Sequence, residues 1–198
     1  MLRELFPRLP DIQASGPPDL LRSRFIHGVK HRRPPSPPVA PARSLRRMAD
    51  VSVSREIAAP PERVWELVSD MTRMGEWSPE ATGGKWVKGA TGPAAGAHFK
   101  GTNKAGWQRW STTCEIVDCV PGERFSFAVT AGPAKVATWS YDIEPTEAGC
   151  RVTESWTDQR SSFFAGVTKR VTGVKDRAEH NRTTMERTLE ALERAATS

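Results

Sequence analysis

Between residues 85 and 158 the chain contains one strand-like segment after another, with no helical segment between them. Alternating or β-branched stretches are separated by short turns rich in glycine and proline, and the expected strands are 85–87, 97–101, 107–120, 124–130, 136–143 and 151–158. Parallel strands would need long crossover connections, which are usually helical. The pattern therefore predicts a meandering antiparallel sheet.

The segments on either side of this stretch complete an α+β pattern. Residues 51–57 alternate apolar and polar side chains, which predicts a further strand, and Pro60-Pro61 and Asp70 then favour the starts of two short helices. After Ser162 the apolar spacing changes to that of a helix, expected from about residue 174 to 196 and roughly 33 Å long. We therefore expect a curved seven-stranded antiparallel sheet wrapped around a long C-terminal helix, with two short helices after the first strand.

Residues 1–47 have a different composition from the rest of the chain. They hold nine of the sixteen prolines, and ten Lys and Arg oppose three acids, so their formal charge is +7 and that of the remainder is −1. Because proline removes backbone donors, we expect a disordered Pro/Arg-rich extension without a regular helix or ladder, followed by a ligand-binding domain over residues 48–198. Two explanations of the extension compete: translation begins at Met48, or the extension is a genuine flexible arm.

Charge and cysteine content argue against several partners and cofactors. A domain that is near neutral offers no basic face for specific nucleic-acid binding. The three cysteines have no CxxC spacing, so reduced thiols in the cytoplasm are expected, with neither disulfides nor a metal site. No run approaches the ~20 apolar residues of a membrane span. We expect no cofactor, and a monomer or weak homodimer.

A bent sheet closed by one helix is expected to leave an apolar cavity, since one helix cannot fill its whole concave side. Ligand sites are typically concave and mostly apolar with a few polar groups. Single aromatic residues on strands usually belong to the core, but some of the set should line the cavity. The residues expected to contact a ligand are Trp77, Trp110, Phe125, Phe127, Trp139, Tyr141, Glu154, Trp156, Asn181 and Met185.

Glu154 is the most informative polar residue among them. It shares a strand face with Val152 and Trp156, so it should point into the core, where a carboxylate is either paired or has a raised pKa. The sequence leaves open whether Glu154 anchors a ligand or forms an ion pair with Arg109 or Arg124. On the C-terminal helix, Asn181 lies on the apolar side, whereas His180 is expected to be solvated.

Five motifs resemble those of one known superfamily, and they occur in the expected order from Val51 onward, over about three-quarters of the chain. The motifs are IAAPPERVW (57–65), EWSPE (76–80), WSTTCE (110–115), PGERF (121–125) and GCRVTESW (149–156). The sequence resembles the START-like, or Bet v 1-like (SRPBCC), superfamily, and within it the polyketide cyclase/dehydrase and lipid-transport group common in actinobacteria. The resemblance implies a helix-grip fold around a cavity. It implies no single reaction, because such proteins include lipid carriers, hormone receptors and cyclases.

Two hypotheses of function follow. The first is a carrier or sensor of a small hydrophobic molecule, such as a lipid or a polyketide-like aromatic. The second is a cyclase or dehydratase-like enzyme in which Glu154 and Tyr141 exchange protons and Asn181 orients a carbonyl group. No GxSxG or HExxH motif is present, and the sequence shows no convincing catalytic set. A weaker third hypothesis is regulation of a protein partner through a ligand-gated surface.

Overall fold

The computed structural model describes residues 19–20, 29–31, 48–163, 165–167, 173–174 and 176–198. The chain divides into two compact units, Met1–Arg47 and Met48–Ser198. In the first unit, β1 (Asp19–Leu20) pairs with β2 (Val29–His31) in antiparallel orientation. The expectation that this stretch holds no ladder is therefore wrong at these residues. The expected disorder of the remainder of residues 1–47 lies outside the described residues.

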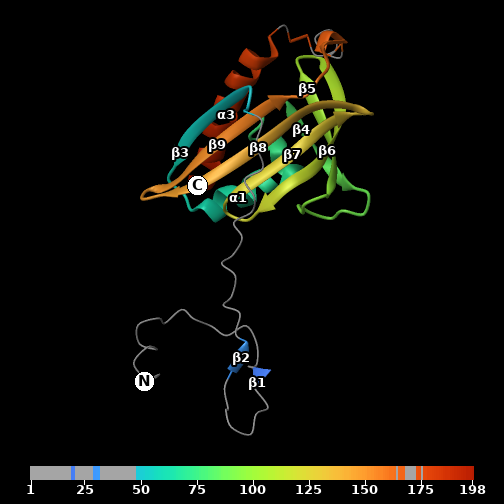
Figure 1. Ribbon diagram of the computed structural model, residues 1–198. Helices are drawn as coiled ribbons and strands as arrows, with labels where there is room; N and C mark the ends of the chain where they lie inside the picture. Colours follow the sequence, from blue (N-terminus) through green and yellow to red (C-terminus); the bar gives the residue numbers. More distant parts are fainter. Residues whose placement is uncertain (1–18, 21–28, 32–47, 164, 168–172, 175) are drawn as a thin grey trace. The chain divides into compact units, whose positions relative to one another are not determined.

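The second unit has the predicted order of strand, two short helices, six strands and a long helix (Figure 1). Its elements are β3 (Val51–Ile57), α1 (Pro61–Ser69), the 3-10 helix η2 (Met71–Glu76), β4 (Ala81–Val87), β5 (His98–Ala105), β6 (Gln108–Val120), β7 (Arg124–Ala131), β8 (Ala134–Thr146), β9 (Gly149–Asp158) and α3 (Arg177–Thr197). The strands form one curved antiparallel sheet in the order β3-β9-β8-β7-β6-β5-β4. The α+β helix-grip prediction is confirmed.

The C-terminal helix begins three residues later than expected. Asp176 is its N-cap, and the Asp176 carboxylate accepts a hydrogen bond of 3.1 Å from the backbone N–H of Glu179. Aspartate satisfies one of the donors that have no partner within the first turn, which fixes the start of the helix. From there α3 lies against β3, β9 and α1.

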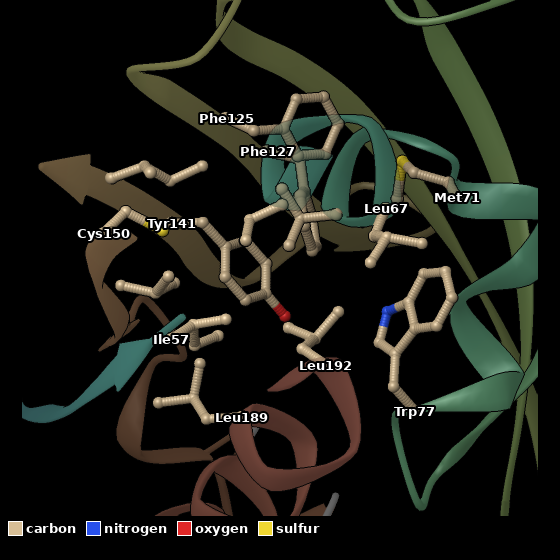
Figure 2. Close-up of a cluster of buried hydrophobic side chains, with 14 of the residues drawn as sticks. Ile57, Leu67, Met71, Trp77, Phe125, Phe127, Tyr141, Cys150, Leu189 and Leu192 are labelled. Carbon is tan, nitrogen blue, oxygen red and sulfur yellow. The ribbon is translucent and has the colours of Figure 1, made fainter. Parts of the chain in front are cut away.

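The core joins one face of the sheet to α1 and α3. Leu189 and Leu192 of α3 pack with Ile57 of β3, Leu67 of α1 and Phe125 of β7, all almost fully buried (Figure 2). A smaller cluster contains Val51, Ala137, Trp156 and Met185. The two clusters hold the C-terminal helix against the sheet at different points along its length.

A bulge changes the side-chain alternation of β6. The pairing of β6 with β7 shifts between Ile116 and Asp118, and Val117 at the shift is half-exposed. Because the bulge adds a residue, Cys119 packs on the core side, as Cys114 does. Strict alternation would place these two cysteines, which are five residues apart, on opposite faces, and the bulge instead places both on the core side.

The first strand after η2 is longer than predicted. β4 begins at Ala81, four residues before the expected start, and includes Gly83 and Gly84. A Cβ atom on Gly84 would lie only 2.5 Å from the Phe99 ring. Glycine here permits a close approach of β4 to β5 rather than ending the strand. None of the described helices is both long and apolar enough to cross a bilayer.

Candidate ligand-binding cavity

A cavity of about 360 Å³ lies between the concave side of the sheet and the helices. Its wall comes from η2, the segment that follows it, the strands β4 to β9 and the inner side of α3. Most of the lining is apolar, with Phe99, Phe127, Val129, Trp139 and Trp156 among the lining side chains. The Trp139 and Trp156 ring centroids are 6.4 Å apart and tilted by 51°. Such a wall suits a flat or flexible hydrophobic molecule.

One polar pair lies within this apolar wall. Tyr141 on β8 and Glu154 on β9 are direct cross-strand partners, and both line the cavity. The Tyr141 hydroxyl donates a hydrogen bond of 2.9 Å to Glu154 Oε1. Both side chains are buried, and Glu154 Oε2 has no hydrogen-bond partner among the described residues. Figure 2 shows the Tyr141 hydroxyl pointing from β8 into the space between the sheet and the C-terminal helix.

Burial decides the protonation state of this pair. Loss of solvation raises the pKa of Glu154 to about 8, against the opposing effect of the Tyr141 hydrogen bond. Burial and the neighbouring carboxyl also raise the pKa of Tyr141 well above its usual value. Near neutral pH both groups therefore carry their protons. A protonated Glu154 can donate a hydrogen bond from Oε2 to an oxygen atom inside the cavity.

Charged groups gather at the end of the cavity near the start of α3. Arg177 donates two hydrogen bonds to Glu80, of 3.1 and 2.7 Å, and His180 Nε2 lies 2.8 Å from Glu80 Oε1. Nearby on the cavity wall, Arg160 binds Asp158 at 2.6 Å. His180 is only partly solvated: its side chain is 34% exposed, and its Nε2 contacts Glu80, which follows η2 and meets the first turn of α3.

The cavity reaches the protein surface beside these charged groups. Val167 lines the cavity and is also 40% exposed. Trp110 and Asn103 of the β5–β6 hairpin line the same end, as does Ala131 at the end of β7. The opening therefore lies among the β5–β6 hairpin, the end of β7 and the segment that precedes α3.

Comparison with known proteins identifies the family. A family model described as polyketide cyclase / dehydrase and lipid transport matches residues 48–197. The chain belongs to this family. This family is part of the START-like, or Bet v 1-like, superfamily that the five motifs indicated. The resemblance noted in the sequence is therefore confirmed. No curated protein matches the chain.

Solved structures support the same fold for this family member. The major latex-like protein 151 from Panax ginseng matches with a TM-score of 0.59 at 12% identity, over 75% of this chain and 97% of that chain. The di-domain ARO/CYC StfQ from the steffimycin biosynthetic pathway matches with a TM-score of 0.59 at 13% identity, over 74% of this chain and 50% of that chain. A polyketide-cyclase-like protein from Corynebacterium glutamicum is 35% identical over 73% of this chain and 88% of that chain, with a TM-score of 0.49.

Six of the ten expected ligand contacts line the cavity of this family member. They are Trp110, Phe127, Trp139, Tyr141, Glu154 and Trp156. The other four are buried in the core instead and do not line the cavity: Trp77, Phe125, Asn181 and Met185. Phe125 lies on the same face of β7 as Phe127 but packs among α1 and the core leucines. Side-chain parity identifies the inner face, but it does not separate filled from unfilled space.

Several lining residues were not anticipated from the sequence. Phe99 and Thr112 lie on the inner faces of β5 and β6, and the alternation of those strands would have identified them. Met71 and Met74 of η2 also line the cavity. Glu80 and Arg177 are 97 residues apart in the chain, and no local pattern indicates that they meet.

The lining offers little to a metal ion or to a nucleophilic mechanism. Within the described residues no group of three His, Cys, Asp or Glu side chains could hold a metal. Cys114 lines the cavity, but burial raises the pKa of its thiol to about 12, so it stays protonated and unreactive. Away from the charged end of the cavity, the buried Tyr141–Glu154 pair can donate or accept a proton.

Proposed function

We propose that the protein binds one small, largely apolar molecule in this cavity, as a carrier or sensor, and holds an oxygen atom of that molecule through Glu154. The observation that carries the proposal is Glu154 Oε2, a buried atom of a mostly apolar lining that has no hydrogen-bond partner among the described residues. A buried polar atom without a partner costs about 1–3 kcal/mol, and a ligand oxygen would remove that cost. The volume of about 360 Å³ is in the range of small-molecule sites.

The relatives support a hydrophobic ligand without specifying it. The family description combines polyketide cyclase, dehydrase and lipid transport, and one structural neighbour is a di-domain ARO/CYC protein from the steffimycin biosynthetic pathway. These relatives favour lipids and polyketide-like aromatic molecules, both of which combine apolar surface with oxygen atoms. The free thiols of Cys114, Cys119 and Cys150 support action in a reducing compartment such as the cytoplasm.

A matched pair of probes tests this proposal. 1-Acetylnaphthalene and 1-ethylnaphthalene have similar shapes, but only the first has a carbonyl oxygen. Titration of the full chain, followed by tryptophan fluorescence, should show the ketone binding roughly tenfold more tightly, because only the ketone accepts a hydrogen bond from Glu154. Native mass spectrometry of the purified protein should show a bound hydrophobic molecule.

A cavity-filling variant locates the binding. Thr112→Trp adds a large side chain to the lining, whereas Thr113→Trp adds it to the outer face of the same strand. The first substitution should abolish binding of both probes, and the second should leave it unchanged. If neither naphthalene binds and no molecule co-purifies, the proposed function is wrong.

A second candidate function is dehydratase or cyclase chemistry, and the protonated Glu154 beside Tyr141 favours it. In a dehydration, Glu154 would give its proton to the leaving hydroxyl as the C–O bond breaks. The resulting carboxylate, held by the Tyr141 hydroxyl, would accept the proton from the neighbouring carbon, so that one water molecule is lost and Glu154 is restored. Glu154→Gln should then abolish turnover of a β-hydroxy ketone while its affinity stays the same. An unchanged rate would remove Glu154 from the mechanism.

A further inference from the structure

Two large aromatic side chains are exposed at the open end of the cavity. Trp107 is 88% exposed and Phe163 is 82% exposed. Single exposed apolar side chains are common, but exposed apolar side chains that gather in one place mark contact with a partner or a membrane. Tryptophan is also enriched at membrane–water interfaces, where its ring contacts apolar groups and its N–H contacts water or headgroups.

Both residues lie beside the cavity opening. Trp107 is in the turn between β5 and β6, next to the lining residues Asn103 and Trp110. Phe163 is in the helical residues 162–163, and Val167 in the helical residues 165–167 lines the opening. Gly173 lies against the hairpin, since a Cβ on Gly173 would lie 3.1 Å from the Gln108 side chain. In Figure 1 the orange segment around residue 163 lies beside the tip of this hairpin.

The hairpin tip is positively charged. Lys104 and Arg109 are direct cross-strand partners that flank Trp107, and both are exposed. Like charges in direct opposition destabilise a strand pair. Neither side chain forms an ion pair with any described residue, so no described carboxylate relieves their repulsion. By contrast, Glu80 and Asp158 at this end are paired with arginines. Of the other two carboxylates there, Asp176 caps α3 and Glu179 lies 3.9 Å from Arg182.

We propose that Lys104, Trp107, Arg109 and Phe163, here called the docking rim, bind the surface of an anionic lipid bilayer. The two aromatic rings enter the headgroup region, and the two cations contact lipid phosphates. The charges favour this occupant over a second copy of the chain, because two docking rims facing one another would bring four cations together. Anionic lipid removes the repulsion between Lys104 and Arg109.

Docking would place the cavity opening against the membrane. The purpose of this placement rests on the proposed function, the binding of a hydrophobic ligand. A hydrophobic ligand partitions into lipid, so an opening held at the bilayer surface allows transfer without passage through water. Docking itself does not require a ligand. Failure of vesicle binding therefore leaves the cavity proposal standing, and failure of naphthalene binding leaves the docking proposal standing.

Flotation of the full chain with lipid vesicles tests the docking rim. The vesicles contain either phosphatidylcholine alone or phosphatidylcholine with phosphatidylglycerol at about 7:3. Residues 1–47 carry a formal +7 and will attract acidic lipid in every variant, so the test compares variants that all keep them. The variants are Trp107→Ser/Phe163→Ser, Lys104→Gln/Arg109→Gln and a matched control, Val117→Ser/Val120→Ser. The control removes two exposed apolar side chains at the opposite end of β6.

The proposal gives a different result for each variant. Loss of the aromatic pair should weaken binding to anionic vesicles on the order of tenfold. Loss of the two cations should weaken it about fivefold per charge, with little effect on neutral vesicles. The control should bind as the original protein does. Equal binding by all variants would overturn the proposal. The proposal would also be overturned if light scattering showed that the Trp107→Ser/Phe163→Ser variant loses dimers while its vesicle binding is unchanged.

Discussion

Glu154 gives the protein a specific dependence of stability on pH. Its pKa is raised to about 8 in the folded state, whereas in the unfolded chain it stays near the ordinary 4.5. Between these values only the folded state keeps the proton, so this group's contribution to the free energy of unfolding is present below pH 4.5 and is lost as pH rises to about 8. We expect Glu154→Gln, which stays neutral, to match the original protein at pH 5 and to exceed its stability by a few kcal/mol at pH 8.

Urea unfolding at several pH values between 5 and 8 measures this difference. Other titrating groups are present in both proteins and cancel in the comparison. Glu115→Gln on the exposed side of β6 is the control, and its effect should not grow with pH in the same way. A Glu154→Gln effect that stays constant from pH 5 to 8 would show that Glu154 is ionised in the folded protein throughout.

The inward position of Glu154 could be predicted from its sequence, but its partner could not. Alternation along residues 152–156 is enough to place the side chain in the core, and the structure agrees. The partner depends on the register between β8 and β9, which makes Tyr141 its neighbour. The expected alternative, Arg124, is held instead by Asp118 and Asp142 on the adjoining strands. The sequence pattern of a single strand does not determine its register with a neighbouring strand, so the Tyr141 partner could not be predicted.

At the level of elements, the Glu80 contacts attach the start of α3 to the segment after η2. Glu80→Ala removes the acceptor shared by Arg177 and His180 and leaves Arg177 partly buried without its partner. We expect hydrogen exchange of the backbone amides to become roughly tenfold faster in the first two turns of α3 and in residues 71–80, because these elements then open locally. Exchange in β8 and β9 should be unchanged.

Glu186→Gln is the matched control for this experiment, because Glu186 is exposed on the same helix. Uniform acceleration across the whole sheet after Glu80→Ala would contradict a local role. It would indicate that the contact supports the global stability of the domain instead.

The errors in element boundaries have physical causes. The first half of β4 was not predicted, because it contains Gly83 and Gly84 and glycine usually ends a strand. Here Gly84 instead permits a close approach to Phe99. The bulge at Val117 is a shift in the register of β6 against β7, and the alternation within β6 does not indicate it. Both features depend on neighbouring strands, so propensity and periodicity along one segment do not reveal them.

At the scale of the whole molecule, the order of the elements is sufficient to predict the architecture. Six consecutive strands need an antiparallel meander, and one long amphipathic helix can cover only part of a curved sheet. The existence of a cavity follows from this geometry, but its extent does not. Phe125 and Phe127 share a face of one strand, yet only Phe127 lines the cavity, because α1 packs over Phe125. The boundary of unfilled space is decided by three-dimensional packing.

Residues 48–198 should fold and bind ligand without the preceding 47 residues. The buried core residues of the described chain begin at Val51, and the family match begins at residue 48. We therefore expect a protein that starts at Met48 to keep its midpoint of thermal unfolding within about 2 °C, since the described core residues all lie in the part that is kept. Its formal charge changes from +6 to −1, because the deleted residues carry +7.

This charge change separates two sources of membrane attraction. Without the extension, long-range attraction to acidic vesicles should fall steeply, whereas the contribution of the docking rim should remain and still depend on Trp107. Scanning calorimetry and flotation of the shortened protein, with and without Trp107→Ser, measure both effects. A large drop in the unfolding midpoint would mean that residues 1–47 stabilise the domain, and it would contradict the division of the chain at Met48. An unchanged midpoint together with loss of all sensitivity to Trp107 would mean that the extension alone binds lipid.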